Sequence, residues 1–420
     1  MQRLAYPVCA LMFSGVFIAI YLNTPAPDLS ALYLAGYAVA QGLPEALYTL
    51  GPEGLGGAPS SAHQGLMAEI GLQPTDQIGA FVAPPLWAWL MAPFTKLLTL
   101  TDFQNGVLVL QVGMLSVSVG LAWKVVRPPQ MTLAQFVGLG FAFLALSAPA
   151  AQALAQNTPQ ITVLFLVLLA FERYRAGSFA MAGMILAVAA AFKLSLLFLA
   201  LIFILERNGR ASGAFALTGA ALGAMSVALA GWPLHARFLG LLRELDAVIL
   251  FDKSNYAPEV VFYQLSALLS GTAHSPQPTS LPEPFWLSTV MAALMLAALA
   301  ALILMRPRLV PGTAVPVLLL GFVLATALFG PVSWAFSFTL PLLLLPTLFH
   351  IMSRQTAWRW IIGLGLLQSL PASWLYLKMG DRVFISSLVG VLCYLGLLVV
   401  LVALVFRAVR FRPDVPQPFR

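Results

Sequence analysis

Charged side chains are scarce in this sequence. Of its 420 residues, 9% are charged and 60% are hydrophobic, whereas roughly a quarter of the residues in a soluble globular domain are charged. The mean hydropathy is +0.91. This composition excludes a soluble globular protein and indicates that lipid surrounds most of the chain. Because a charge at membrane depth is costly unless it is paired or functional, we expect the few charged residues to show where function lies.

Cysteine and histidine are scarce too. Cys9 and Cys393 each lie inside an apolar run near opposite ends of the chain, so no disulfide framework is predicted. The sequence has no phosphate-binding P-loop, which argues against ATP-driven transport. No cofactor is predicted, and a requirement for a divalent metal is left open. The sequence has four histidines, and their spacing is not that of metal ligands. They are His63, His235, His274 and His350.

The basic residues stand in ones and twos where apolar runs end. This placement is typical of the positive-inside rule for membrane proteins. It does not resemble a nucleic-acid-binding patch, although the net charge is +7, so no nucleic-acid partner is expected. The clearest pairs are Arg173 with Arg175, Arg207 with Arg210, Arg306 with Arg308, and Arg354 with Arg359.

The acidic residues are distributed differently. Ten of the 15 fall in two polar segments, five in residues 23–80 and five in residues 232–284, and the first segment contains no Lys or Arg. We therefore place both segments outside the cytoplasm as outer loops. Their Gly and Pro content indicates loop structure, with short surface helices predicted at 29–41 and 256–270.

About a dozen apolar runs lie outside these loops, each close to the ~20 residues that cross a bilayer as a helix. They are continuous and lack the alternation of barrel strands, which excludes a transmembrane barrel. The sequence predicts an all-α polytopic membrane protein of about 11–13 transmembrane helices. We expect an uncleaved first span over 7–22, with the N-terminus in the cytoplasm. We expect one membrane domain over residues 1–410 and a cytoplasmic tail over 411–420.

Two runs leave the topology open. If every run crosses once, the bases between Lys124 and Arg175 fall on the wrong side of the membrane. The rule is restored if 81–98, which contains three prolines, is re-entrant and if 178–205 is a broken hairpin. Lys193 lies near the middle of the second run, where a lysine cannot easily reach an interface. It is either a site residue or structurally paired inside the bundle.

Asp28 stands just past the first span and before a helical stretch over residues 31–41. In that position it could be a helix N-cap, whose carboxylate accepts from free backbone N–H groups. It could also be a general base at the membrane surface that takes a proton from a hydroxyl group. The two roles are compatible, because a cap would also orient the carboxylate.

Several motifs occur in the order found in a known family. Residues 28–42 with Tyr48 resemble the first outer-loop motif of glycosyltransferase family 87, the polyprenol-phosphate-mannose-dependent mannosyltransferases of the GT-C superfamily. Residues 81–86 are similar to the family's Tyr-Pro-Pro segment with Ala83 in place of tyrosine, and residues 155–162 to its Gly-Gln-Val-Asn stretch. Residues 183–193 resemble its Gly-rich helix ending in lysine, and residues 330–334 its Ser-Pro-Ile-Ser-Trp motif. The resemblance covers roughly residues 1–350.

The resemblance implies a GT-C fold and an inverting sugar transfer at the outer face of the cell membrane. The donor would be a polyprenyl-phosphate sugar such as mannose, and the acceptor a lipid or an envelope glycan. An acid in the first outer loop deprotonates the acceptor hydroxyl, and Asp28 occupies the matching place. The leaving phosphate needs positive charge; the candidates are Lys193, Arg243 and Lys253, with Arg237 as a further base in the same loop.

Tyr33, Tyr37, Asn157 and Trp334 are candidate substrate-binding residues within these motifs. Packing of a surface helix could also explain the two tyrosines, and an interfacial aromatic belt could explain Trp334. The family's usual acidic residue and histidines after this tryptophan are absent, since the chain continues with Ala335. An inactive GT-C relative that binds a polyprenyl lipid without catalysis therefore stays open. A transporter or polyprenyl-lipid flippase stays open as well, because a dozen helices with few intramembrane charges would serve that function equally well.

Overall fold

The computed structural model describes residues 2–48, 61–73, 75–76, 78–271, 280–330, 332–379 and 382–408. The predicted tail 411–420 and His274 lie outside the described residues. The described chain is almost entirely helical, with one two-stranded antiparallel sheet that pairs β1 (Val248–Leu250) with β2 (Ser280–Pro282). The prediction of an all-α polytopic membrane protein is confirmed.

The helices follow one another with few long connections. The α-helices are α1 (Gln2–Tyr21), α2 (Pro27–Ala40), α3 (Ser61–Glu69), α4 (Leu86–Thr95), α5 (Leu100–Val126), α6 (Leu133–Leu146), α7 (Ala148–Gln156), α8 (Gln160–Arg175), α9 (Phe179–Phe192), α10 (Leu201–Leu205), α11 (Gly209–Ala230), α12 (Trp232–Asp246), α13 (Pro258–Leu269), α14 (Phe285–Met305), α15 (Pro311–Leu328), α16 (Thr339–Leu344), α17 (Arg354–Leu367), α18 (Leu370–Tyr376) and α19 (Arg382–Ala408). The 3-10 helices are η1 (Pro44–Tyr48), η3 (Leu194–Ala200), η4 (Arg306–Arg308), η5 (Ala335–Phe338) and η6 (Leu345–His350).

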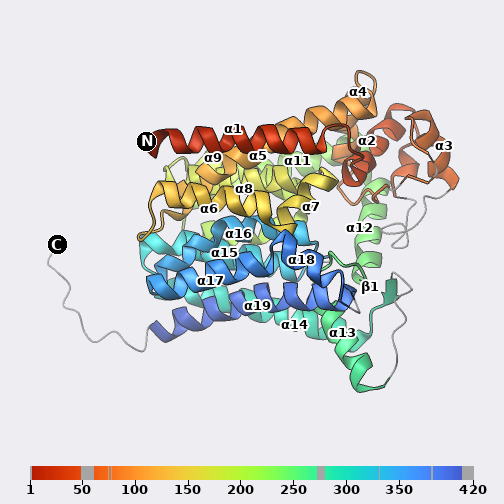
Figure 1. The fold of residues 1–420 in the computed structure, drawn as a ribbon. Helices are drawn as coiled ribbons and strands as arrows, with labels where there is room; N and C mark the ends of the chain where they lie inside the picture. The colour runs from red at the N-terminus through yellow and green to blue at the C-terminus, as the bar shows by residue number, and fades with distance from the viewer. Residues whose placement is uncertain are drawn as a thin grey trace.

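The long helices lie side by side in a bundle, and the shorter α2, α3, α12 and α13 gather at one end of it, which we call the loop end (Figure 1). Among the described residues, five helices are long and apolar enough to cross a membrane, and several shorter apolar helices lie beside them. The five candidate spans are Leu100–Val126, Gly209–Ala230, Phe285–Arg308, Pro311–Leu328 and Val383–Arg407.

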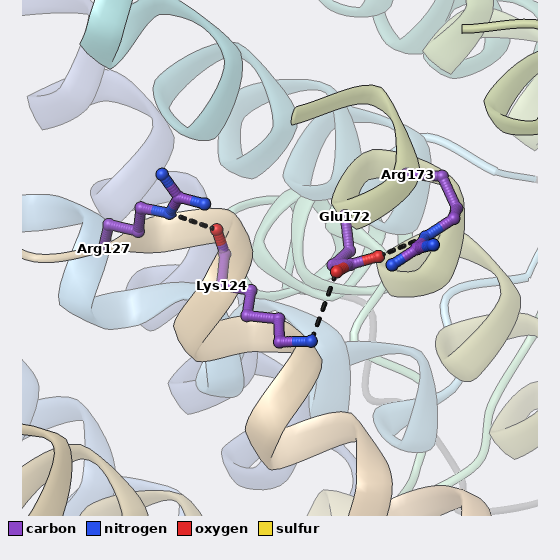
Figure 2. A network of polar contacts seen from close by, with 4 residues as sticks. All are labelled: Lys124, Arg127, Glu172 and Arg173. Atoms are coloured by element: carbon purple, nitrogen blue, oxygen red, sulfur yellow. Dashed lines mark hydrogen bonds and ion pairs between the residues drawn. The ribbon is translucent and has the colours of Figure 1, made fainter. Parts of the chain in front are cut away.

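Basic residues from distant parts of the chain meet at the opposite end, which we call the basic end. Glu172 is 5% exposed and binds both Lys124, at 3.3 Å, and Arg173, at 2.5 Å (Figure 2). Arg306 pairs with Glu206 at 2.5 Å. Helices α5, α8, α10 and α14 therefore have their basic or acidic termini on the same side of the bundle.

This gathering depends on two interruptions of apolar runs. Helix α4 has ten residues and spans about 15 Å, half of the ~30 Å hydrocarbon thickness. Helix α9 ends at Phe192, and the chain continues after Lys193 as η3 and α10 to Glu206. The run at 178–205 is thus two shorter pieces, which brings Glu206 back to the basic end, where it meets Arg306.

The bundle core is built from Leu, Val, Ala and Phe, and helix α15 lies at its centre. Fifteen of the 18 residues of α15, Ala314 to Leu328, are buried. In contrast, few residues of α11 are buried, so this helix presents most of its apolar surface to the outside of the bundle. Such an outward face suits contact with lipid.

Candidate active site

A cavity of about 350 Å³ lies at the loop end. It is formed where α2, α4 with the preceding residues 79–84, the α7–α8 turn, the α9–η3 break, α12 and the segment before η5 meet. Segments from six parts of the sequence thus enclose one space. Its polar lining consists of Asp28, Thr158, Gln160, Lys193 and Ser195, and its aromatic lining of Phe81, Trp87, Phe192, Phe238 and Trp334.

Asp28 is the carboxylate of this cavity. Helix α2 begins at Pro27, and its N-cap is Ala26, so the prediction of Asp28 as an N-cap is wrong: the fixed φ of proline starts the helix two residues earlier. Burial raises the pKa of the Asp28 carboxyl to about 6, and a hydrogen bond from Thr158 limits the rise. A carboxylate with this pKa is ionised at neutral pH and basic enough to accept a proton.

Gly79 makes room for that carboxylate. Its backbone N–H donates to the carbonyl of Pro27 at 3.2 Å, which holds the chain against the start of α2. A Cβ atom at position 79 would lie 3.3 Å from Oδ1 of Asp28, closer than most carbon contacts. The glycine therefore lets the backbone pass directly beside the carboxyl group.

Lys193 brings a positive charge to the same cavity. It follows the end of α9 with an extended backbone, φ −140° and ψ 104°. Its Nζ donates to Oγ of Ser337 at 3.1 Å and to Oε1 of Gln160 at 3.5 Å. Both partners are neutral, and the ion pairs found among the described residues do not include Lys193. Its charge is therefore available to an anion that enters the cavity.

The cavity wall next to Lys193 is aromatic. Trp87 stacks on Phe192 with ring centroids 3.5 Å apart, and its Nε1 donates to the carbonyl of Ala191 at 2.7 Å. Trp334 is held by its backbone, which forms a bridge with Asn255. Flat rings fixed in this way offer surfaces on which an apolar sugar face or an isoprenoid unit can pack.

An apolar groove of about 360 Å³ adjoins the cavity. The two spaces share Pro84, Leu194 and Phe238. The groove runs between α9 and α11, and its floor includes Gly219 and Gly223 of the outward-facing α11. The polar cavity thus continues into an apolar channel at the side of the bundle.

Both tyrosine candidates lie away from the cavity. Tyr33 is 3% exposed and donates to the carbonyl of Leu98 at 2.7 Å. Tyr37 donates to Oε2 of Glu69 at 2.9 Å. Neither lines the cavity. Both hydroxyl groups are held by contacts within the protein, as packing of a surface helix would require.

Asn157 also lies behind the cavity wall. It ends α7 in the left-handed conformation, with φ 48°, and its Nδ2 donates to the carbonyl of Gln104 at 2.9 Å. Asparagine tolerates this backbone conformation better than most residues do. The turn bends α8 by 117° from α7, and this bend directs Thr158 and Gln160 into the cavity.

The two loop bases predicted for the donor phosphate, Arg243 and Lys253, are exposed and do not line the cavity. Arg243 lies in the last turn of α12, whereas the cavity is lined by Phe238, Leu242 and Leu245 of that helix. In the described part of the chain, no group of three or more His, Cys, Asp or Glu residues could hold a metal ion.

Fold and cavity together define a polytopic membrane protein with a charged site at one end of its bundle. The model of glycosyltransferase family 87 matches residues 81–327, which is more than half of the chain, and the chain belongs to this family. It is therefore a membrane glycosyltransferase. A search of curated proteins finds no match. The matched range includes Lys193 and the groove, whereas Asp28 and Trp334 lie outside it.

Proposed function

We propose that this glycosyltransferase transfers mannose from a polyprenyl-phosphate carrier to a hydroxyl group of a lipid or envelope glycan. One observation carries the proposal: Asp28 and Lys193 line a single cavity that continues into an apolar groove. The cavity suits a sugar phosphate, and the groove suits an isoprenoid chain. The loop end would lie outside the cytoplasm, because the basic end would be cytoplasmic by the positive-inside rule.

The reaction follows from the two charged groups. The acceptor oxygen attacks the anomeric carbon while Asp28 takes the hydroxyl proton, and the bond from that carbon to the phosphate oxygen breaks. Attack from the face opposite the phosphate inverts the anomeric configuration. Polyprenyl phosphate leaves with an additional negative charge, which the ammonium of Lys193 stabilises. Thr158 keeps the Asp28 carboxylate oriented for the transfer.

The direct test uses purified protein in nanodiscs, supplied with labelled polyprenyl-phosphate mannose and a membrane lipid extract. We expect label in a lipid-extractable or glycan product and stoichiometric release of polyprenyl phosphate. Nucleotide-activated mannose in place of the lipid donor should give no product. Transfer from the nucleotide sugar alone, or no transfer from any polyprenyl-phosphate sugar, would contradict the proposal, and the second result would favour the inactive relative.

The activity should depend on pH through Asp28. Its pKa of about 6 means that the base is ionised above pH 6 and protonated below it. We therefore expect kcat/KM for the acceptor to fall about tenfold per unit as the pH drops below 6. The control is Glu283→Gln, because Glu283 lies outside the cavity and burial raises its pKa to about 7. If the acidic limb of the pH profile disappeared in Glu283→Gln, the titrating group would be Glu283 and not Asp28.

Filling the groove should weaken binding of long-chain donors. Gly223 lines the groove, and a Cβ added there meets no atom within 4 Å, so the side chain of Gly223→Leu would start in open space. Since each buried CH₂ contributes about 0.8 kcal/mol, displacing a few of them should raise KM about tenfold or more. A donor with a single isoprene unit should be little affected.

Gly213→Leu is the matched control for this variant. Gly213 lies on the same helix, is exposed, has open space around its Cβ and does not line the groove. If both substitutions raised KM for the long-chain donor equally, added side-chain volume anywhere on α11 would impair the enzyme. In that case the groove would not be the site of the isoprenoid chain.

A further inference from the structure

A second hollow lies on α17, away from the catalytic cavity. It is a shallow, open depression. It is formed along one face of the helix, where residues four apart stand one above the other. The hollow is lined by Arg354, Gln355, Trp358, Arg359, Ile362 and Gly363.

This hollow begins at the basic end of the bundle. His350, four residues before α17, has its Nε2 2.8 Å from the carbonyl oxygen of Val126, the last residue of α5. At the other end of α17, the carbonyl of Gln368 accepts from the N–H of Ala148 at 2.8 Å. Helix α17 therefore runs from the basic end toward α7 at the loop end, and its two arginines lie near its start.

Both arginines are exposed, and neither belongs to an ion pair among the described residues. At this end of the bundle, by contrast, Arg173 and Arg306 each have a carboxylate partner. Two unpaired guanidinium groups beside a hollow favour an anion with several oxygen acceptors, which arginine binds in a bidentate way.

The surface below the arginines is apolar. Ile362 is 53% exposed and Leu367 is 46% exposed, and a smaller hollow continues from Arg359 past Gly363 to Leu367. The eight steps from Arg359 to Leu367 rise about 12 Å along the helix, which is close to the ~15 Å hydrocarbon depth of one leaflet. The site thus has a cationic head and an apolar floor of the length of a lipid chain.

We propose that this α17 hollow binds one anionic diacyl phospholipid of the leaflet at the basic end. The phosphate lies between Arg354 and Arg359, and an acyl chain packs along the surface from Ile362 to Leu367. Basic pockets among transmembrane helices at the cytoplasmic side are a known setting for anionic headgroups. The site is separate from the catalytic cavity and does not depend on the proposed donor.

The test is native mass spectrometry of the full chain with added dioleoyl-phosphatidylglycerol. We expect one retained lipid per wild-type protein and about thirtyfold weaker lipid binding in the double variant Arg354→Gln/Arg359→Gln, since each arginine near the surface contributes about 1 kcal/mol and about 1.4 kcal/mol is a factor of ten in affinity. Gly363→Leu should reduce occupancy as well, because its Cβ would enter open space in the hollow while both charges stay. Dioleoyl-phosphatidylcholine should not be retained.

The charge-matched control is Arg207→Gln/Arg210→Gln, which removes two exposed arginines that line neither hollow on α17. It should retain the lipid as wild type does. Equal loss in this control, unchanged retention in Gly363→Leu, or retention of polyprenyl phosphate in place of phosphatidylglycerol would each overturn the proposal.

Discussion

Asp28→Asn is expected to lower kcat for sugar transfer by about 10²–10⁴-fold, the usual contribution of a positioned general base. The substitution keeps the size of the side chain and an oxygen that can accept from Thr158, but removes the ability to take up a proton. KM for the donor should change little, because the donor phosphate is assigned to Lys193. The measurement is steady-state transfer from a polyprenyl-phosphate sugar in nanodiscs.

The stability of Asp28→Asn separates catalysis from structure. The folded-state pKa of about 6 exceeds the ~3.9 of an unfolded aspartate, so the fold disfavours the ionised form, and Asp28 reduces stability increasingly as the pH rises from about 4 through 6. At neutral pH the variant should therefore melt at the same temperature as wild type or higher. A markedly lower melting temperature together with lost activity would indicate a structural role.

Asp76→Asn is the matched control for this variant. Asp76 is a carboxylate of the same outer segment, accepts from the backbone N–H of Gln73 at 2.7 Å and does not line the cavity. Its substitution should leave transfer close to the wild-type rate. If Asp28→Asn retained full transfer, the proton would have to go to another group, and the assignment of the base would be wrong.

Elements with a strong local signal could be predicted from the sequence. The expected surface helices at 29–41 and 256–270 correspond to α2 (Pro27–Ala40) and α13 (Pro258–Leu269). The apolar composition determines that most helices lie in lipid, and the position of bases at the ends of runs indicates their direction. These signals depend on neighbouring residues alone, so they can be recognised without knowledge of the tertiary contacts.

The lining of the site depends on contacts that local patterns do not carry. Trp87 is fixed by the carbonyl of Ala191, 104 positions away in the sequence. Neither segment has a local pattern that predicts this contact. For Tyr33 a local pattern is present, but it does not predict where the side chain lies. Its helical spacing from Tyr37 indicates a shared direction, but α5 and the end of α4 cover Tyr33, so its ring enters a packed core.

Polar and aromatic residues at breaks in regular structure predicted the cavity lining better than residues inside a helix did. Asp28 at the start of α2, Lys193 at the end of α9 and Trp334 before η5 all line the cavity, whereas Asn157, at another break, sets the bend that positions its neighbours. A polar group within an apolar chain needs a physical reason to be there. Where that group also interrupts a helix, it can face a cavity that the helices themselves leave open.

Lys193→Met should reduce kcat by about 10²–10³-fold, the cost of removing one group that stabilises transition-state charge in a site shielded from water. Methionine keeps the apolar stem and most of the length of the side chain, so Trp87 and Phe192 can keep their stacking. The ammonium faces neutral partners in Ser337 and Gln160. Its loss therefore removes charge from the cavity without leaving a buried carboxylate unpaired, and the protein should still fold.

The charge assigned to Lys193 acts mainly on the leaving phosphate, so kcat should fall more than KM rises, and donors with a better leaving group than a phosphate monoester should recover part of the rate. Lys96→Met is the control, because Lys96 is an exposed lysine at the end of α4 that does not line the cavity. A Lys193→Met enzyme that binds donor weakly but turns over normally would place this lysine in ground-state binding only. The transition-state charge would then need another cation.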